Sequence, residues 1–144
     1  MPPERAGIQR VDSFPIGNGV DSMASISTKR VYDAPAEGDG ERILVDRLWP
    51  RGVSKERAAL AEWNRDVAPS TELRKWFGHD PERFEEFSAR YREELASSPA
   101  AEAFAQACRE RLGHGQNVTL LYAARDPACN HAIVLKGWLD NRIG

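Results

Sequence analysis

The sequence predicts an α/β fold, with a small, mainly parallel sheet of about three or more strands and helices covering both faces. The chain has 144 residues, 41% of them hydrophobic, which is enough for one compact core but short for two domains. Two apolar runs, Ile43–Val45 and Val118–Tyr122, are continuous rather than alternating, as in strands that are buried on both faces. Helical segments separate these runs, so we expect parallel pairing through a right-handed crossover in a helix-rich domain.

The N-terminal segment differs from the rest of the chain in its composition. Residues 1–27 mix Pro, Gly, Ser and isolated apolar residues without a helical or strand period, which predicts a flexible tail. Met23 lies within this segment and is a candidate for an alternative start of the protein. Residues 28–144 are expected to form the α/β domain, with Lys29–Asp33 as its first strand.

Five helices are expected because each has a recognisable start signal. Serine or aspartate side chains accept hydrogen bonds from first-turn amides, and proline favours the first helical position. These signals, with the apolar spacing behind them, predict helices over residues 54–60, 70–77, 80–95, 98–112 and 126–139. Arg42–Leu48 is expected to be a central second strand and Asn117–Ala123 a third. The segment Trp63–Pro69 is expected to be irregular, because proline disfavours helix at the residue before it.

Composition and charge argue against a nucleic-acid-binding, membrane or secreted protein. A formal net charge of −2 gives no global attraction to nucleic acid or to an anionic membrane, so nucleic acid is not the expected partner. No run approaches the roughly 20 apolar residues of a membrane span, and the N-terminus lacks a secretory pattern. We therefore expect a soluble, cytoplasmic protein without a membrane partner. Cys108 and Cys129 form no CxxC pair and are expected to be reduced thiols.

The candidate site is expected where the central strands end. In parallel sheets flanked by helices, ligands bind outside the carboxyl ends of the strands, where helix N-termini also converge. The residues expected to bind a ligand at this edge are Arg47, Trp49, Arg51, Arg125, Asp126 and Asn130. His131 and Tyr122 are the expected catalytic residues if the protein is an enzyme, because a histidine exchanges protons near neutral pH.

The expected ligand is an anionic small molecule that carries a phosphate or a carboxylate. The three arginines would hold it by bidentate hydrogen bonds, and the helix that begins at Asp126 would add unpaired amides and a partial positive charge. The alternative is structural: Asp126 satisfies those amides itself, and the arginines pair with Asp46 and surface carboxylates.

Motifs for metals and cofactors are missing from the sequence. Cys129 and His131 are two candidate metal ligands, but zinc requires three or four at recognisable spacings. The chain has no Gly-rich phosphate loop and no GxSxG nucleophile motif. We therefore expect neither a metal nor a cofactor.

Several long motifs occur in a fixed order along the chain. They read VDRLWPRGVSK, then APS.ELRKWFGHDP, then F..RY..EL, then VTLLYAARDP..NHA.VL. In these motifs, over about Lys29 to Leu139, the chain resembles the uncharacterised DUF488 family, in particular its short YeaO-like branch. Broader members look as though they carry Cys-Ala-Glu and Cys-His-Arg segments. The matching segments here are Tyr122–Ala124 and Asn130–Ala132, so the resemblance carries over the histidine alone.

Three functions stay open from the sequence. The first is the binding of an anionic small molecule at the strand ends, with His131 as acid or base if a reaction occurs. The second is a regulatory or nucleic-acid-binding module that uses Arg65, Arg74 and Lys75 around the helix capped by Ser70. The acidic balance and the lack of a clear recognition helix argue against it. The third is a protein-interaction domain without catalysis.

Overall fold

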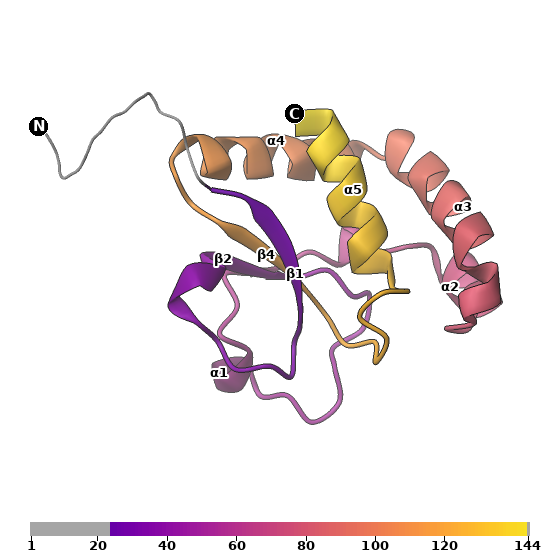
Figure 1. The fold of residues 1–144 in the computed structure, drawn as a ribbon, viewed down its shortest axis with the longest axis horizontal. Helices are drawn as coiled ribbons and strands as arrows, with labels where there is room; N and C mark the ends of the chain where they lie inside the picture. Colours follow the sequence, from indigo (N-terminus) through magenta and orange to yellow (C-terminus); the bar gives the residue numbers. More distant parts are fainter. Residues whose placement is uncertain (1–23, 144) are drawn as a thin grey trace, which may run out of the picture.

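The computed structural model describes residues 24–143, and its centre is a four-stranded sheet (Figure 1). The strands are β1 (Ile26–Arg30), β2 (Glu41–Leu44), β3 (Glu62–Trp63) and β4 (Val118–Tyr122). Their order is β1-β4-β2-β3, and all three pairings are parallel. The inner strands are thus β4 and β2, which carry the two continuous apolar runs. The predicted parallel α/β fold is confirmed.

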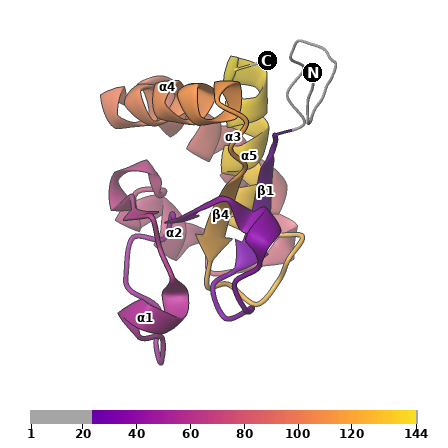
Figure 2. The ribbon, with the colours of Figure 1, turned by 90° about the vertical axis from the view of Figure 1, so that its left-hand side faces the viewer.

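Helices make up most of the rest of the described chain. They are η1 (Glu37–Asp39), α1 (Lys55–Ala58), η2 (Arg65–Val67), α2 (Thr71–Phe77), η3 (Pro81–Arg83), α3 (Phe84–Ala96), α4 (Pro99–Gly113) and α5 (His131–Ile143). The longer helices α3, α4 and α5 gather on one side of the sheet, and the short α1 lies on the other (Figures 1 and 2). None of the helices within residues 24–143 has the length and apolar character needed to cross a membrane.

The inner strands bury side chains on both faces, as their continuous apolar sequence predicts. All five residues of β4 are buried, and successive side chains of a strand point to opposite faces. Leu120 therefore belongs to the main core beneath the long helices, whereas Leu121 belongs to a second core with Leu44 and Ala58. Through this second core, α1 and its flanking segments pack against the face of the sheet opposite the long helices.

Most of the predicted helix starts are confirmed. The hydroxyl oxygens of Ser54, Ser70 and Ser98 each accept a hydrogen bond from an amide of the following first turn, at 3.1, 3.2 and 3.1 Å. Asp80 also caps its segment, but the chain first forms η3 and becomes α-helical only at Phe84. Caps are local interactions between neighbouring residues, which explains why they can be recognised in the sequence.

Three strand predictions differ from the structure. The second strand ends at Leu44 rather than Leu48, because its ladder with β4 ends at Leu44 and Leu121. The first strand covers Ile26–Arg30 rather than Lys29–Asp33, because pairing with β4 matches Ile26 to Val118. The sheet thus begins before the boundary expected at residue 27, and residues 1–23 lie outside the described residues. The segment predicted to be irregular begins with β3, whose Trp63 pairs with Leu44 of β2.

The predicted start of the last helix is wrong. Asp126 does accept hydrogen bonds, from the amides of Ala128 at 2.8 Å and Cys129 at 3.1 Å, but these close a turn. Helix α5 begins at His131, capped by Asn130, whose side-chain oxygen accepts the amide of Ile133 at 3.1 Å. His131 is therefore the first residue of the helix, and Ala128 lies before the helix and is exposed.

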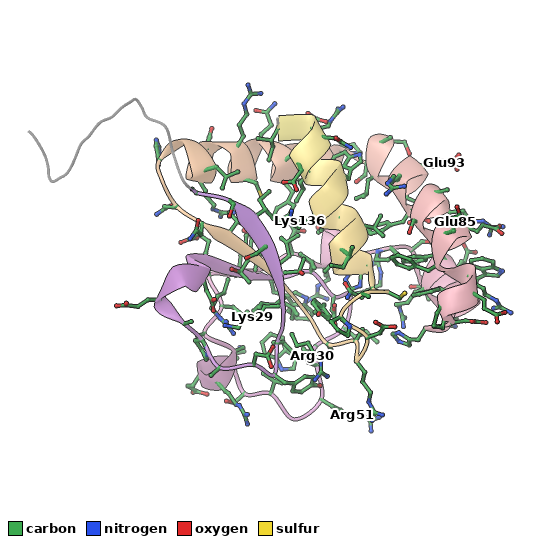
Figure 3. All side chains as sticks on the ribbon, viewed as in Figure 1. Lys29, Arg30, Arg51, Glu85, Glu93 and Lys136 are labelled. Carbon is green, nitrogen blue, oxygen red and sulfur yellow. The ribbon has the colours of Figure 1, made fainter. Side chains whose placement is uncertain are left out.

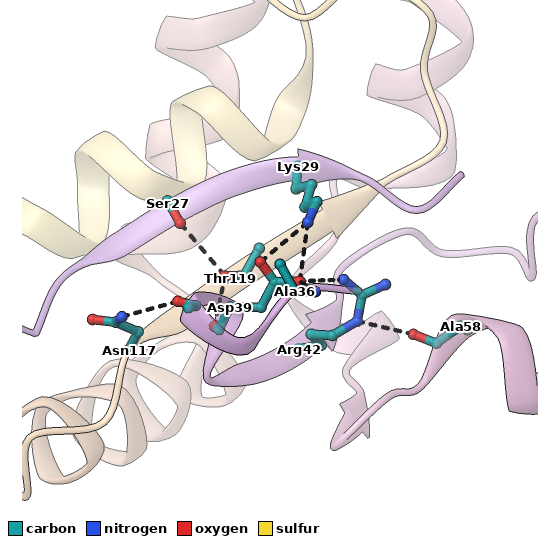
Figure 4. A network of polar contacts seen from close by, with 9 residues as sticks. Ser27, Lys29, Ala36, Asp39, Arg42, Ala58, Asn117 and Thr119 are labelled. Carbon is teal, nitrogen blue, oxygen red and sulfur yellow. Dashed lines mark hydrogen bonds and ion pairs between the residues drawn. The ribbon is translucent and has the colours of Figure 1, made fainter. Parts of the chain in front are cut away.

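A network of paired charges lies on the α1 side of the sheet (Figure 4). The Asp39 carboxylate is held by Arg42 at 2.6 Å, by Lys29 at 3.1 Å and by the amide of Ala36 at 3.0 Å. Thr119 of β4 donates to the backbone carbonyl of Asp39 at 2.7 Å. We call Lys29, Asp39, Arg42 and Thr119 the Asp39 network; it ties η1 to three strands.

Candidate functional site

A pocket of about 530 Å³ opens where β2 and β4 end. One wall consists of the chain that leaves these strands and the start of α5, and the other consists of residues before and on α2 and α3. We call it the edge pocket. Its lining residues are Asp46, Arg47, Leu48, Ala68, Pro69, Arg74, Phe77, His79, Phe87, Ala123, Ala124, Arg125, Asp126, Asn130 and His131. This is the sheet edge at which parallel α/β proteins bind ligands.

A carboxylate and an imidazole are paired in one wall of the edge pocket. His131 Nε2 lies 3.2 Å from Asp46 Oδ1 and 3.0 Å from the carbonyl oxygen of Val45. Both neighbours are acceptors, so Nε2 carries a proton. The other carboxylate oxygen of Asp46 accepts the amide of Ala123 at 3.1 Å. Asp46 therefore joins the exits of β2 and β4 to the start of α5.

Three arginines line the edge pocket, and they differ in how they are held. Arg47 donates from Nε to the carbonyl of Pro69 at 3.2 Å and from Nη2 to that of Ala68 at 3.3 Å, which fixes its guanidinium across the two walls. Arg74 projects from α2 and has a buried Nε without a hydrogen-bond partner in the described part of the chain. Arg125 is exposed at the mouth.

Asp126 and Asn130 shape the start of α5. The carboxylate of Asp126 is engaged with the amides of its own turn, and its carbonyl accepts the side-chain amide of Asn130 at 2.8 Å. Asn130 is buried, with 1% of its surface exposed, because it both caps α5 and ties the turn. Asp126 thus satisfies nearby backbone amides itself, as the structural alternative proposed. These amides belong to the turn before α5, and the residue that caps α5 is Asn130.

The wall formed by α2, α3 and the residues before α2 carries apolar side chains beside Arg74 and His79. It contains the buried Ala68, Pro69, Phe77 and Phe87, and the last two rings stack with centroids 4.3 Å apart. Behind them Tyr91 donates from its hydroxyl to the carbonyl of Val67 at 2.5 Å. Burial raises the pKa of Tyr91 well above its usual value, reinforced by the nearby carboxylates. The aromatic row of α3 therefore forms core and pocket wall together.

The structure brings Arg47, Arg125, Asp126, Asn130 and His131 to the edge pocket, as predicted for these residues. Of the two predicted catalytic residues, His131 lines the pocket and Tyr122 does not.

Three of the predicted site residues lie elsewhere. Trp49 donates from its indole to the carbonyl of Val53 at 2.7 Å and packs edge-on against Trp63. Arg51 is exposed and extends away from the domain (Figure 3). Tyr122 is 3% exposed in the main core, where burial raises its pKa above the usual value. A buried phenol with a raised pKa is poorly suited to exchange a proton with a ligand.

Sequence reasoning did not include three polar residues that line the edge pocket. Asp46 directly follows the apolar run of β2, and this position at the strand exit could have identified it as a pocket residue. From the sequence, Asp46 was considered only as a partner for an arginine. Arg74 and His79 lie on and just after α2, and no sequence signal shows that this helix faces the strand ends. His79 has a φ of 59°, a left-handed conformation that follows the α2 cap.

The two thiols do not contribute to the edge pocket. Cys108 is buried in the main core, which raises its pKa to about 11, and Cys129 lies in the turn before α5 without lining the pocket. Within residues 24–143, no three His, Cys, Asp or Glu side chains are grouped so as to hold a metal ion.

The sheet order, the covering helices and the arginines at the strand ends define a small parallel α/β domain with an edge pocket. The chain belongs to the DUF488 family: the family model DUF488-N3i, described as the inactive DUF488-N3 subclade, matches residues 25–144. The resemblance stated from the motifs is thereby confirmed.

The similar proteins are uncharacterised. The uncharacterised protein YeaO of Escherichia coli strain K12 is 44% identical over 116 residues, which cover 80% of this chain and 96% of YeaO. The uncharacterised protein Rv3073c of Mycobacterium tuberculosis is 43% identical over 117 residues, which cover 81% of this chain and 95% of the relative. No solved structure matches the chain. The relatives therefore identify the family without assigning an activity.

Proposed function

We propose that this domain binds a small anionic molecule in the edge pocket and does not transform it. The observation that carries the proposal is the placement of Arg47, Arg74 and Arg125 around one pocket at the strand ends. Planar guanidinium groups recognise phosphate and carboxylate through paired hydrogen bonds. The start of α5 lies in the same wall and adds the partial positive charge of a helix N-terminus.

The carboxylates of the pocket are already engaged within the protein. Asp46 accepts the amide of Ala123 through Oδ2, and Asp126 accepts the amides of its turn. Asp46 Oδ1 lies 3.2 Å from His131 Nε2 but has no hydrogen-bond partner within residues 24–143. Three arginines against two aspartates leave one net positive charge when the histidines are neutral. An anion is therefore the complementary ligand.

The absence of a hydroxyl, thiol or amine nucleophile among the described lining residues supports binding without a reaction. Among the described residues that line the edge pocket, none carries a hydroxyl, a thiol or an amine. Tyr122 and Cys129 are close in sequence to the site but lie outside the lining. The subclade whose model matches the chain is described as inactive, which agrees with a binding role.

A thermal-shift screen tests this proposal. Inorganic phosphate, nucleoside monophosphates and dicarboxylates are added to the wild type, to Arg125→Ala and to Arg51→Ala. We expect at least one anion to raise the melting temperature of the wild type and of Arg51→Ala, because ligand binding stabilises the folded state. The shift should fall sharply in Arg125→Ala. The proposal fails if no anion stabilises the wild type, or if both variants respond equally.

A second candidate is acid–base chemistry by His131, which is favoured by its pairing with Asp46. A carboxylate that fixes the tautomer of a histidine is a recurrent arrangement for proton transfer. The substrate would have to supply the reacting group, since the lining supplies none. A turnover assay with the anions that bind, comparing wild type with His131→Asn, decides between the two candidates.

A further inference from the structure

The edge pocket is much larger than a simple anion. Its volume is about 530 Å³, within the roughly 300–1,000 Å³ of pockets that enclose drug-sized ligands. Inorganic phosphate or acetate has only a handful of heavy atoms and would leave most of this space unfilled. The arginines therefore account for one part of a ligand, and another part must occupy the remaining volume.

The remaining volume is bounded by apolar side chains. Ala68, Pro69, Phe77 and Phe87 form one wall, and Ala123 and Ala124 contribute methyl groups from the exit of β4. These groups offer no hydrogen bonds, so a polar ligand body placed against them would lose its hydration without compensation. An apolar body gains free energy at the same place in proportion to the surface that it buries.

Leu48 supports the same conclusion at the mouth of the pocket. Leu48 is the one exposed large hydrophobic side chain within residues 24–143, with 64% of its surface accessible to solvent. It follows Arg47 directly and lines the pocket, so an apolar side chain and a guanidinium stand together at the entrance. An occupant with an apolar body would cover Leu48 while its charged group meets the arginines.

We infer that the ligand is an amphipathic anion, with one phosphate or carboxylate head and an apolar body the size of a ring. This inference rests on the proposed function, because it names the class of anion that the same pocket takes. The head contacts Arg125 and the neighbouring guanidinium groups. The body lies along the Ala68, Phe77 and Phe87 wall and beneath Leu48.

Calorimetric titration with two probes of similar charge tests the inference. Inorganic phosphate carries the head alone, and phenyl phosphate carries the same head with a ring. We expect phenyl phosphate to bind the wild type at least about tenfold more tightly, since its ring removes apolar surface from water. Leu48→Asn should weaken phenyl phosphate by about threefold or more and leave inorganic phosphate unchanged. Leu48→Met, which keeps an apolar side chain, should retain the wild-type affinity.

The outcomes separate this inference from the proposed function. If both probes bind with equal affinity, and both are weakened in Arg125→Ala, the pocket binds anions but the inference is overturned. If neither probe binds, or if Arg125→Ala and Arg51→Ala bind like the wild type, the proposed function fails and the inference fails with it. Circular dichroism of Leu48→Asn verifies that this surface substitution leaves the fold intact. If Leu48→Asn weakens both probes equally, the assignment of Leu48 to the ligand body is overturned.

Discussion

The Asp39 network and the edge pocket both place arginines beside aspartates on the same sheet, yet the charges are arranged differently. In the network, Arg42 is 4% exposed and its guanidinium points to Asp39 and to the carbonyl of Ala58. In the edge pocket, Arg125 is exposed, and Arg74 has a buried nitrogen without a partner in the described chain. Arg42 also keeps one buried nitrogen without a hydrogen-bond partner in residues 24–143. The two regions therefore differ in surroundings: the charges of the Asp39 network pair with one another inside the protein, whereas the arginines of the edge pocket line a cavity.

This difference separates charges that support the fold from charges that are available to a ligand. Burying a charge costs free energy unless a partner and hydrogen bonds compensate it, so the Asp39 network contributes to stability only as a complete set. Arg125, which is exposed, remains hydrated and should contribute little to stability. Substitutions in the two regions should therefore affect different measurements.

The largest effect on stability is expected for Asp39→Asn. The substitution leaves the charges of Arg42 and Lys29 without a carboxylate, and Arg42 is buried. We expect the free energy of unfolding to fall by about 3 kcal/mol. Urea denaturation followed by circular dichroism measures this. Asp33→Asn, an exposed position after β1, is the matched control and should change stability by less than about 0.5 kcal/mol. Equal effects would contradict a structural role for the network.

The pH dependence of the same pair of proteins gives a second prediction. Burial raises the pKa of Asp39, but hydrogen bonds from Ala36, Arg42 and Lys29 outweigh burial and hold it below its ordinary value of 3.8. A lowered pKa in the folded state stabilises the protein above the unfolded value, and this contribution disappears as the pH falls through the folded value. The stability difference between wild type and Asp39→Asn should thus be constant near neutral pH and shrink below about pH 3.8. A difference that grows on acidification would contradict it.

A smaller loss is expected for Asp46→Asn at the edge pocket. The amide still accepts from Ala123, but its nitrogen would face the protonated Nε2 of His131 unless the side chain turns. We expect a loss of about 1–2 kcal/mol in the free energy of unfolding, because one charged hydrogen-bonding partner is removed. Asp140→Asn removes a carboxylate of an exposed pair with Lys136 and should cost about 0.5 kcal/mol or less. Equal losses in both variants would indicate that the contacts of Asp46 contribute no more to stability than an exposed ion pair does.

The smallest effect on stability is expected for Arg125→Ala, at less than about 0.5 kcal/mol. Its consequence lies in binding: the affinity for phenyl phosphate should fall about tenfold, which corresponds to about 1.4 kcal/mol. Arg51→Ala changes an exposed arginine outside the lining and should leave both quantities unchanged. Calorimetric titration alongside urea denaturation measures the two effects separately. A loss of stability in Arg125→Ala without a loss of affinity would show that Arg125 supports the fold rather than the binding of the ligand.

The sequence predicted those parts of the fold that depend on neighbouring residues. Continuous apolar runs indicated the inner strands, and the serine caps marked three helix starts. Strand β3 is only two residues long and half-buried, so its sequence carries no pattern of its own and its pairing with β2 decides it. The last helix was misplaced because Asp126 does cap amides, but those of a turn, while Asn130 three residues before Ile133 was the better cap signal.

The site was predicted less completely because it is assembled across the fold. Residues that leave β2 and β4 could be placed at one edge by the rule for parallel sheets, which located Arg47 and Arg125. The same rule could not tell which strand-exit residues face the cavity, so Trp49 and Arg51 were included although they turn away. The wall from α2 and α3 depends on how helices pack, which no local pattern encodes.

Amide chemical-shift mapping with phenyl phosphate tests the central distinction most directly, because it compares both regions in one titration of the wild type. We expect concentration-dependent shifts at Arg47 and Leu48, through Ala123–His131, and at Arg74 and His79, while Lys29, Asp39 and Arg42 remain unchanged. Shifts centred on the Asp39 network, or no shifts around the edge pocket at saturating probe, would contradict the assignment of the pocket as the ligand site.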